Sequence, residues 1–296
     1  MQNGFRLPNL PTRIGTRAAA TMGSAVAIFL GLGALAFFSL VALRDTDGDV
    51  LVRAGAADLG LATEGRSASL PTAGQVGRAR AFADSRVGFV SFAVVDTSGE
   101  LRCYRCRVRY VSASVVKAML LVAYLDRLAH DRRPLMPSHA ALLDAMIRFS
   151  DNSAASALYT HVGRAGLYRL AARAKMRDFD VSGSWATAQI TAADQARFFA
   201  QLDALTPAEY RAYARQLLSS VVRSQAWGIA RASRPRWLTF FKGGWRETTR
   251  GQLVHQVALL ESGRRSLSIA VLTDGNPSQR YGRATVRGIA ARLLGG

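Results

Sequence analysis

Lysine is almost missing from this chain. Of its 39 basic residues only three are lysines, namely Lys117, Lys175 and Lys242, and all the others are arginines. Arginine stays protonated in a protein, whereas the amine of lysine can lose its proton. A site that needs a neutral amine must therefore keep a lysine, so the three lysines are the first candidates for chemistry.

Cysteine is also scarce, with Cys103 and Cys106 as the only pair, in a C-x-x-C spacing. Two cysteines cannot form a disulfide-rich scaffold, and two ligands alone do not make a structural zinc site. The same spacing occurs in thioredoxin-like redox sites, but the βαβ pattern that accompanies such a site is missing here. We expect a local disulfide or free thiols, and neither a metal nor a cofactor.

Histidine is rare as well, and its four positions do not form a catalytic pattern. His130, His139 and His161 are scattered at expected helix ends or loops, and His255 lies within an apolar strand. No Ser-His-Asp or metal-ligand spacing is present. A structural role is therefore expected for His255.

The N-terminal segment has the properties of a membrane anchor. Residues 18–43 contain no charged residue, and as a helix they would reach roughly 39 Å, enough to cross a hydrocarbon core of about 30 Å. A cleaved signal peptide has a shorter apolar region, so an anchor is favoured over cleavage. Arginines before the span predict a cytoplasmic tail over 1–17, a linker over 44–71 and an extracytoplasmic domain over 72–296.

Acidic residues are outnumbered, which gives a net charge of +19. Nucleic acid is the usual partner of so basic a chain, but the aromatic-plus-basic RNA signatures are absent and the domain is expected outside the cytoplasm. We therefore expect no nucleic-acid partner. Solvated arginines that face anionic headgroups or an acidic cell wall need no specific partner.

The chain is long enough for one main domain, in which strands flank a helical block. Thr191 and Thr206 are expected to cap two helices within this block. Periodicity predicts further helices over 72–84, 114–130, 139–149, 153–174 and 279–294, and strands over 87–96, 238–245, 252–261 and 266–273, with a second strand that ends near Tyr110. This order predicts an α/β fold with two lobes, in which one antiparallel sheet from both termini is flanked by helices and the middle forms an all-helical lobe.

A possible nucleophile begins the most apolar helix. In Ser114-Val115-Val116-Lys117 the lysine lies three residues after the serine, on the same helix face. An unperturbed lysine is only about 0.04% neutral at pH 7, so burial or a nearby cation must lower its pKa before it can act as a base. The S-x-x-K spacing alone can also arise by chance.

Two further motifs are weak when taken singly. Ser150-Asp151-Asn152 precedes a helix, where short polar residues are often simple caps. The pair Gly243-Gly244 follows Lys242 inside an apolar strand, where glycines mark either a bulge or the close approach of a ligand to the backbone.

Together the three motifs resemble those of class A β-lactamases and penicillin-binding proteins, which have S-x-x-K, S-D-N and K-T-G in this order. The run SDNSAASALY is similar to the class A form, and Gly243 replaces the usual threonine. The resemblance covers residues 72–296 and implies the two-lobed fold of that family. It also implies that Ser114 attacks an acyl carbonyl, that Lys117 takes its proton and that Ser150 relays a proton to the leaving nitrogen.

By the same resemblance, Asn152 would bind the substrate amide, and Lys242 with its two glycines would hold the substrate carboxylate. The oxyanion hole would consist of the backbone N–H groups of Ser114 and Trp245. That role needs only backbone, so the tryptophan is compatible with it.

Two departures from the family pattern concern turnover. Its β-lactamases have a glutamate after the second motif that activates the deacylating water, but no carboxylate lies between Asp180 and Asp194. Gly243 also lacks a hydroxyl that would contact the substrate. We expect a membrane-anchored serine hydrolase acylated by β-lactams or by D-alanyl-peptide-like amides of peptidoglycan origin. The alternatives are a D-alanyl-D-alanine peptidase or penicillin-binding protein, a slow-turnover acyl receptor, and a structural wall protein with relic motifs.

Overall fold

The computed structural model describes residues 70–295. The expected cytoplasmic tail and membrane anchor, and all but the end of the linker, lie outside this range. Within it, no helix combines the length and the apolar character that a bilayer crossing requires.

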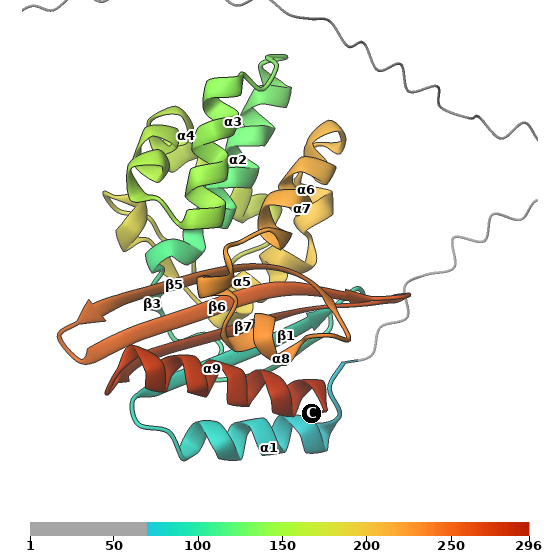
Figure 1. Cartoon of the computed structure of the whole chain (residues 1–296), viewed down its shortest axis with the longest axis vertical. Coiled ribbons are helices and arrows are strands. Elements are labelled where there is room, and N and C mark those ends of the chain that lie inside the picture. Colours follow the sequence, from blue (N-terminus) through green and yellow to red (C-terminus); the bar gives the residue numbers. More distant parts are fainter. Residues whose placement is uncertain (1–69, 296) are drawn as a thin grey trace, which may run out of the picture. The chain divides into compact units, whose positions relative to one another are not determined.

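A five-stranded antiparallel sheet is built from both ends of the described chain (Figure 1). β1 pairs with β7, which brings Phe92 opposite Val271, so the first and last strands lie side by side as the sequence predicts. The strand order is β2-β1-β7-β6-β5, with bounds β1 Phe89–Asp96, β2 Leu101–Tyr104, β5 Leu238–Thr248, β6 Gly251–Ser262 and β7 Arg265–Asn276. This order makes β5 an edge strand.

Two terminal helices pack together on one face of the sheet (Figure 1). They are α1, Ala73–Asp84, and α9, Gln279–Leu294. Thr72 begins α1 with the reciprocal hydrogen bonds of a capping box. The two helices approach closely at Gly288, where a Cβ atom would lie only 2.3 Å from the Phe82 ring. On the other face α5, Ala192–Ala200, packs against β1, β6 and β7.

The middle of the chain forms the predicted helical lobe above the sheet (Figure 1). At its centre α2 packs against α4, and all but the end of α2 is buried, as its apolar sequence predicts. The helices of this lobe are α2 Lys117–His130, α3 Pro137–Asp144, α4 Asn152–Arg173, α6 Leu202–Leu205 and α7 Arg211–Ser219, whereas α8, Gly228–Ala232, packs against α9 and β6. A 3-10 turn, η1 Ala113–Val116, precedes α2, and a π-helical turn, Ala145–Phe149, follows α3.

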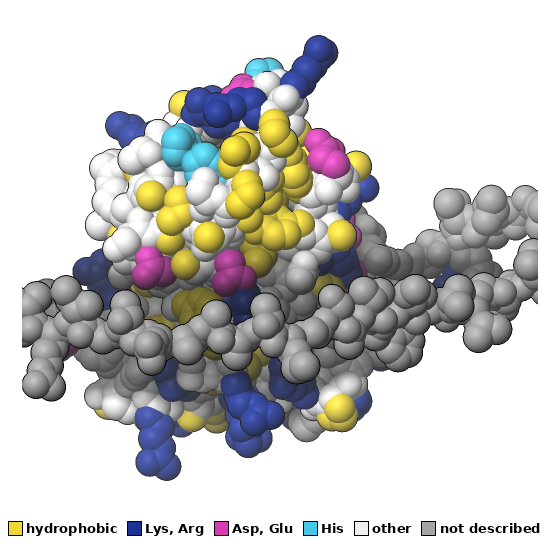
Figure 2. All heavy atoms as spheres, turned by 45° about the horizontal axis from the view of Figure 1, so that its top comes forward, with side chains coloured by type: hydrophobic (Ala, Val, Ile, Leu, Met, Phe, Trp, Pro, Cys, Tyr) yellow, Lys and Arg dark blue, Asp and Glu magenta, His cyan; other side chains and the backbone are white. Residues whose placement is uncertain are grey.

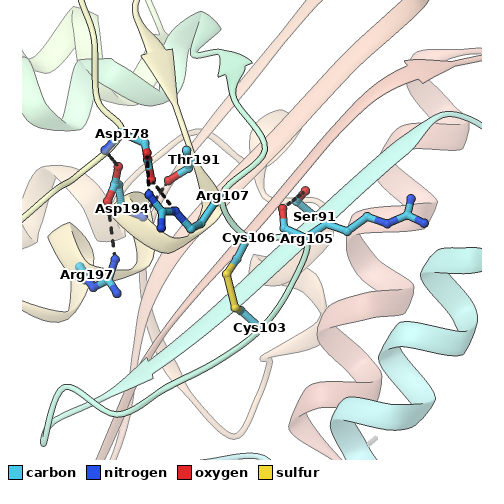
Figure 3. The surroundings of a disulfide bond; sticks show 9 residues. All are labelled: Ser91, Cys103, Arg105, Cys106, Arg107, Asp178, Thr191, Asp194 and Arg197. Atoms are coloured by element: carbon cyan, nitrogen blue, oxygen red, sulfur yellow. Dashed lines mark hydrogen bonds and ion pairs between the residues drawn. A yellow bond between two sulfur atoms is a disulfide. The ribbon is translucent and has the colours of Figure 1, made fainter.

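The prediction that the second strand ends near Tyr110 is wrong. β2 ends at Tyr104, and the chain then turns through the Cys103–Cys106 disulfide (Figure 3). The turn is held from the sheet because Ser91 Oγ donates a hydrogen bond to the Arg105 carbonyl at 2.8 Å. Residues Tyr110–Val111 instead form β3, which pairs with β4, Gln189–Ile190, in a separate two-stranded sheet.

One predicted helix cap is correct and the other is wrong. Thr191 caps α5 by accepting a hydrogen bond from the Asp194 N–H at 3.2 Å. Thr206 does not cap the start of the next helix, because it ends α6 and its hydroxyl donates back to the Leu202 carbonyl at 2.7 Å. Pro207 then begins a short 3-10 turn, and α7 starts only at Arg211.

Candidate active site

Ser114 lies in the 3-10 turn η1, where the helical lobe meets the edge strand β5. The preceding Ala113 has a φ of +45°, a conformation that residues with a side chain rarely adopt. It is held there because the Ser112 N–H donates to the Ala188 carbonyl at 2.7 Å. Such local strain is concentrated at functional sites. Ser114 itself remains partly exposed, as a nucleophile must.

Lys117 is fully buried one turn after Ser114. Its Nζ donates to the Ser150 carbonyl at 2.6 Å and to Asn152 Oδ1 at 2.7 Å, and lies 3.5 Å from Ser150 Oγ. The first two predicted motifs are thus brought together by direct contacts. The Lys117 backbone N–H donates to the Ser114 carbonyl, but within residues 70–295 no side-chain hydrogen bond joins Lys117 Nζ to Ser114, so the proton transfer between them stays a prediction.

Lys242 reaches the same serine from the sheet. It is fully buried in β5, and its Nζ donates to Ser150 Oγ at 3.0 Å and to the Gly243 carbonyl at 3.1 Å. Ser150 Oγ therefore lies between the two lysine amines. The three motifs that are weak singly converge on one hydroxyl group.

Burial changes the acidity of both amines. Desolvation lowers the pKa of Lys117 to about 8, and the negative charge of Asp151 offsets part of this effect. The pKa of Lys242 is lowered well below its usual value, first by burial and then by the positive charge of Lys117. An amine with a pKa near 8 is about 10% neutral at pH 7, compared with about 0.04% for an unperturbed lysine. Lys117 is therefore able to act as a base near neutral pH.

The Ser-Asp-Asn loop combines a structural cap with exposed polar groups. Asp151 is the N-cap of α4, because its carboxylate accepts a hydrogen bond from the Ala154 N–H at 2.7 Å. Ser150 has a φ of +63°, which directs the chain from the π-helical turn into α4. A simple capping role thus explains Asp151, but it does not explain why Ser150 and Asn152 contact Lys117.

The glycines of β5 allow the strand to pass close to the nucleophile. A Cβ atom on Gly244 would lie 2.9 Å from the Ser114 nitrogen and 3.0 Å from the Val115 nitrogen. The pairing of β5 with β6 is continuous here, so no bulge explains the glycines. Trp245 follows next in the strand. The two predicted oxyanion-hole residues, Ser114 and Trp245, therefore lie in the same part of the site, and their hydrogen-bonding role stays a prediction.

Trp227 explains why Gly243 lacks a side chain. A Cβ atom on Gly243 would lie 3.1 Å from Trp227 Cζ2 and 3.4 Å from Cη2, closer than nearly all such contacts. The indole is 8% exposed and packs edge-on against Trp245. No motif in the sequence indicates this contact, because Trp227 lies sixteen residues before Gly243 in a segment with no predicted element.

Trp185 is a second residue that the sequence did not indicate. Its ring centroid lies 4.8 Å from Lys117 Nζ, within the range of a cation–π contact. The loop that carries it is fixed to α4, because Trp185 Nε1 donates to Ser156 Oγ and Tyr159 Oη donates to the Gly183 carbonyl, each at 3.1 Å. The Trp185 ring therefore faces Lys117 from the loop that has no carboxylate between Asp180 and Asp194.

The carboxylates on either side of this loop have other partners. Asp178 pairs with Arg107 at 3.1 Å, and Asp180 accepts a hydrogen bond from Tyr168 Oη at 2.5 Å (Figure 3 shows the first pair). The fully buried Asp194 accepts from two backbone N–H groups, those of Arg177 and Asp178. Because of these interactions, all three carboxylates have structural roles at the two ends of the loop.

His255 is structural, as predicted. It is fully buried, its Nε2 lies 3.1 Å from the Val111 carbonyl, and its Nδ1 accepts from the Thr273 N–H at 3.1 Å. Burial lowers its pKa to about 4, so the ring is neutral near pH 7. Within residues 70–295, no three side chains of the kinds that bind metals are grouped closely enough to hold an ion.

Comparisons with known proteins agree with this geometry. A family model described as "Beta-lactamase enzyme family" matches residues 134–295, more than half of the chain, although Ser114 and Lys117 precede the matched segment. No curated protein matches the chain in sequence.

Several solved structures have the same fold. A beta-lactamase from Sphaerobacter thermophilus has a TM-score of 0.65 at 20% identity, covering 74% of this chain and 95% of its own. A class A beta-lactamase from Bacteroides cellulosilyticus has a TM-score of 0.67 at 14% identity, covering 76% and 97%. A beta-lactamase from Desulfarculus baarsii has a TM-score of 0.61 at 23% identity, covering 77% and 100%.

Proposed function

Since the chain belongs to the beta-lactamase enzyme family and is a serine hydrolase of that type, we propose that β-lactams or D-alanyl-peptide-like amides acylate Ser114 and that the acyl group leaves slowly. The single observation that carries the proposal is the convergence of Lys117 and Lys242 on Ser150 Oγ, beside Ser114. Structural side chains rarely place two buried amines around one hydroxyl, because each amine costs free energy when it leaves water.

In the acylation step, Ser114 Oγ attacks the substrate carbonyl carbon and its proton passes to the neutral amine of Lys117. The negative charge on the carbonyl oxygen is stabilised by the backbone N–H groups of Ser114 and Trp245. The carbon–nitrogen bond then breaks. The Ser150 hydroxyl gives its proton to the leaving nitrogen and regains one from the protonated Lys117.

Substrate binding uses groups at the rim of this network. Asn152 contacts the substrate amide, and Lys242 interacts with the substrate carboxylate from within the sheet. Gly243 offers no hydroxyl to that carboxylate, and Trp227 occupies the adjoining space. The carboxylate is therefore bound with fewer hydrogen bonds than a threonine at position 243 would allow.

Deacylation requires a water molecule that is held and deprotonated near the ester. The loop after the Ser-Asp-Asn motif presents Trp185 to Lys117, and an indole cannot accept a proton from water. Loss of a general base typically slows a step by about 10² to 10⁴. The acyl-enzyme is therefore long-lived, which favours a D-alanyl-D-alanine peptidase, a penicillin-binding protein or a slow-turnover acyl receptor over an efficient β-lactamase.

Membrane anchoring is a separate part of the proposal, and it is supported only by the uncharged run of residues 18–43. On this basis the catalytic domain lies outside the cytoplasm on a single-pass anchor. The test is membrane fractionation of the full chain followed by protease treatment of intact cells. Recovery of the full chain in the soluble fraction would refute anchoring and leave the catalytic proposal intact.

The catalytic proposal is tested by stopped-flow kinetics with a chromogenic cephalosporin. We expect a stoichiometric burst followed by a slow steady state, and mass spectrometry of the trapped protein should place the adduct on Ser114. Ser114→Ala should give neither burst nor adduct. Labelling that persists in that variant, or fast turnover without a burst, would contradict the proposal.

A further inference from the structure

Two adjoining hollows lie behind β5, outside the site described above. The first has a volume of about 590 Å³ and is lined by Arg223, Ala226, Arg231, Arg234 and Arg287. The second, of about 390 Å³, is lined mainly by α8 and α9 and includes Trp227 and Arg283. Arg231 and Arg287 line both, so the hollows form one continuous surface, here called the arginine surface.

The charges of the arginine surface are not neutralised. Its five arginines form no ion pair with any carboxylate of residues 70–295. Elsewhere arginines are often paired, as Arg107 is with Asp178 and Arg250 is with Asp274. The sequence explains the difference, because residues 211–246 and 275–296, which supply the lining, contain no aspartate or glutamate. Although basic side chains occur across the molecule (Figure 2), this cluster is concave and free of acids.

Two buried donors at the arginine surface also lack partners. Trp227 Nε1 and Arg283 Nε make no hydrogen bond, and the Arg283 guanidinium lies 5.3 Å from the centre of the Trp227 ring. Burial lowers the pKa of Arg283, because no carboxylate compensates the lost hydration. Unpaired buried donors are uncommon in proteins, and each carries a desolvation cost that no hydrogen bond offsets. An acceptor that enters the second hollow would relieve this cost.

We propose that the arginine surface binds a soluble polyanionic chain with repeated phosphate groups. Phosphate oxygens fit the fork of donors on a guanidinium, and several arginines around a hollow are the usual means of binding such groups. The two joined hollows are longer than one phosphate needs, so a chain can place successive phosphates against Arg231, Arg287 and Arg283.

A flat anionic bilayer fits these observations less well. A headgroup layer touches protruding side chains, whereas Trp227 is only 8% exposed and lines the second hollow. The surface also borders the catalytic strand, since Trp227 packs against Gly243. A bound chain would therefore hold the enzyme along an acidic polymer with its active site open on the other side of β5.

The test measures binding of the full chain, kept in a nonionic detergent, to inorganic polyphosphate by isothermal titration calorimetry. The variant Arg231→Gln/Arg287→Gln removes the two shared arginines. We expect at least about a tenfold loss of affinity, since a hydrogen bond to a charged group contributes about 1.5 to 3 kcal/mol. The matched control Arg164→Gln/Arg169→Gln removes two exposed, unpaired arginines of α4 and should bind polyphosphate as the parent does.

Two more measurements separate the alternatives. Orthophosphate should bind far more weakly than polyphosphate, and micelles doped with phosphatidylglycerol should not compete for the arginine surface. Trp227→Phe keeps the ring but removes the donor, and it should weaken polyphosphate binding. Equal losses in both double variants, preference for the lipid micelles, or unchanged binding in Trp227→Phe would each overturn the proposal. None of these readouts depends on acylation, so they remain valid if the proposed function is wrong.

Discussion

The two halves of the active site differ in how completely they retain the chemistry that the motifs imply. Around Ser150 two buried lysines, Lys117 and Lys242, are brought within hydrogen-bonding distance of one hydroxyl. In the facing loop a tryptophan, Trp185, takes the place next to Lys117, and the nearest carboxylates have structural partners. This difference supports the proposal that Ser114 is acylated and that the acyl group leaves slowly, because no carboxylate of the described loop faces Lys117.

The largest effect on acylation is expected when Lys117, the base, is replaced by a residue that cannot lose its proton. Lys117→Arg keeps a cation but cannot accept a proton, and acylation should slow by about 10² to 10⁴. The burst rate with a chromogenic cephalosporin measures this effect. Lys175→Arg is the matched control, because Lys175 is exposed and makes none of these contacts, and its burst rate should not change. Near-normal acylation in Lys117→Arg would refute the role of this lysine.

The second half can be altered by supplying the missing base. Trp185→Glu places a carboxylate on the loop that faces Lys117, and a water molecule could then be activated there. We expect the steady-state turnover to rise by about 10², the lower end of the range for a general base, because the loop is not shaped for it. The control Trp185→Gln introduces a side chain of nearly the same shape as glutamate, without its charge. Equal turnover in the two variants would show that the loop does not limit deacylation.

A substitution at Gly243 tests whether Trp227 leaves room for a side chain at this position. Threonine at this position would press its Cβ against Trp227 at 3.1 Å, and overpacking of this kind typically costs about 1 to 3 kcal/mol. Gly243→Thr should therefore lower the melting temperature. The double variant Gly243→Thr/Trp227→Leu should recover part of the loss, which thermal unfolding of the parent, both single variants and the double variant would reveal. Simple additivity of the two changes would mean that the two residues do not compete for space.

The sequence predicted much of the fold because its signals were local. The pattern of apolar residues located α9 at 279–294 and α1 within 72–84. It failed where single side-chain bonds, which the pattern of apolar residues does not reveal, decide the local structure. The turn after β2 depends on a disulfide and on Ser91 from another strand, and Thr206 turns back to bond Leu202 instead of capping the next helix.

The same limit applies to the site. The three short motifs, taken together in their order, indicated Ser114, Lys117 and Lys242. They could not reveal that Trp185 and Trp227 pack against two of these motifs, since each tryptophan is brought there by the fold from a separate segment. Neither has a periodic or motif signal that distinguishes it from an ordinary core residue.

The smallest expected effect concerns pH, and it follows from the environment of Lys117. Its pKa is lowered to about 8 by burial, so the neutral fraction rises from about 10% at pH 7 to about 50% at pH 8. The burst rate should therefore increase about fivefold over this interval and level off above about pH 9. The pKa of His255 is about 4, so this histidine stays neutral throughout and does not contribute.

The titration of Lys117 does not itself destabilise the fold over this range. The pKa of Lys117 is lower in the folded than in the unfolded chain, so between about pH 8 and 10.5 the unfolded state binds more protons, and this residue adds stability as the pH rises. Below pH 8 both states are protonated and its contribution hardly changes. Lys117→Arg is the decisive comparison, because its residual acylation should show no rise centred near pH 8. A rise of the same size in that variant would assign the titration to another group.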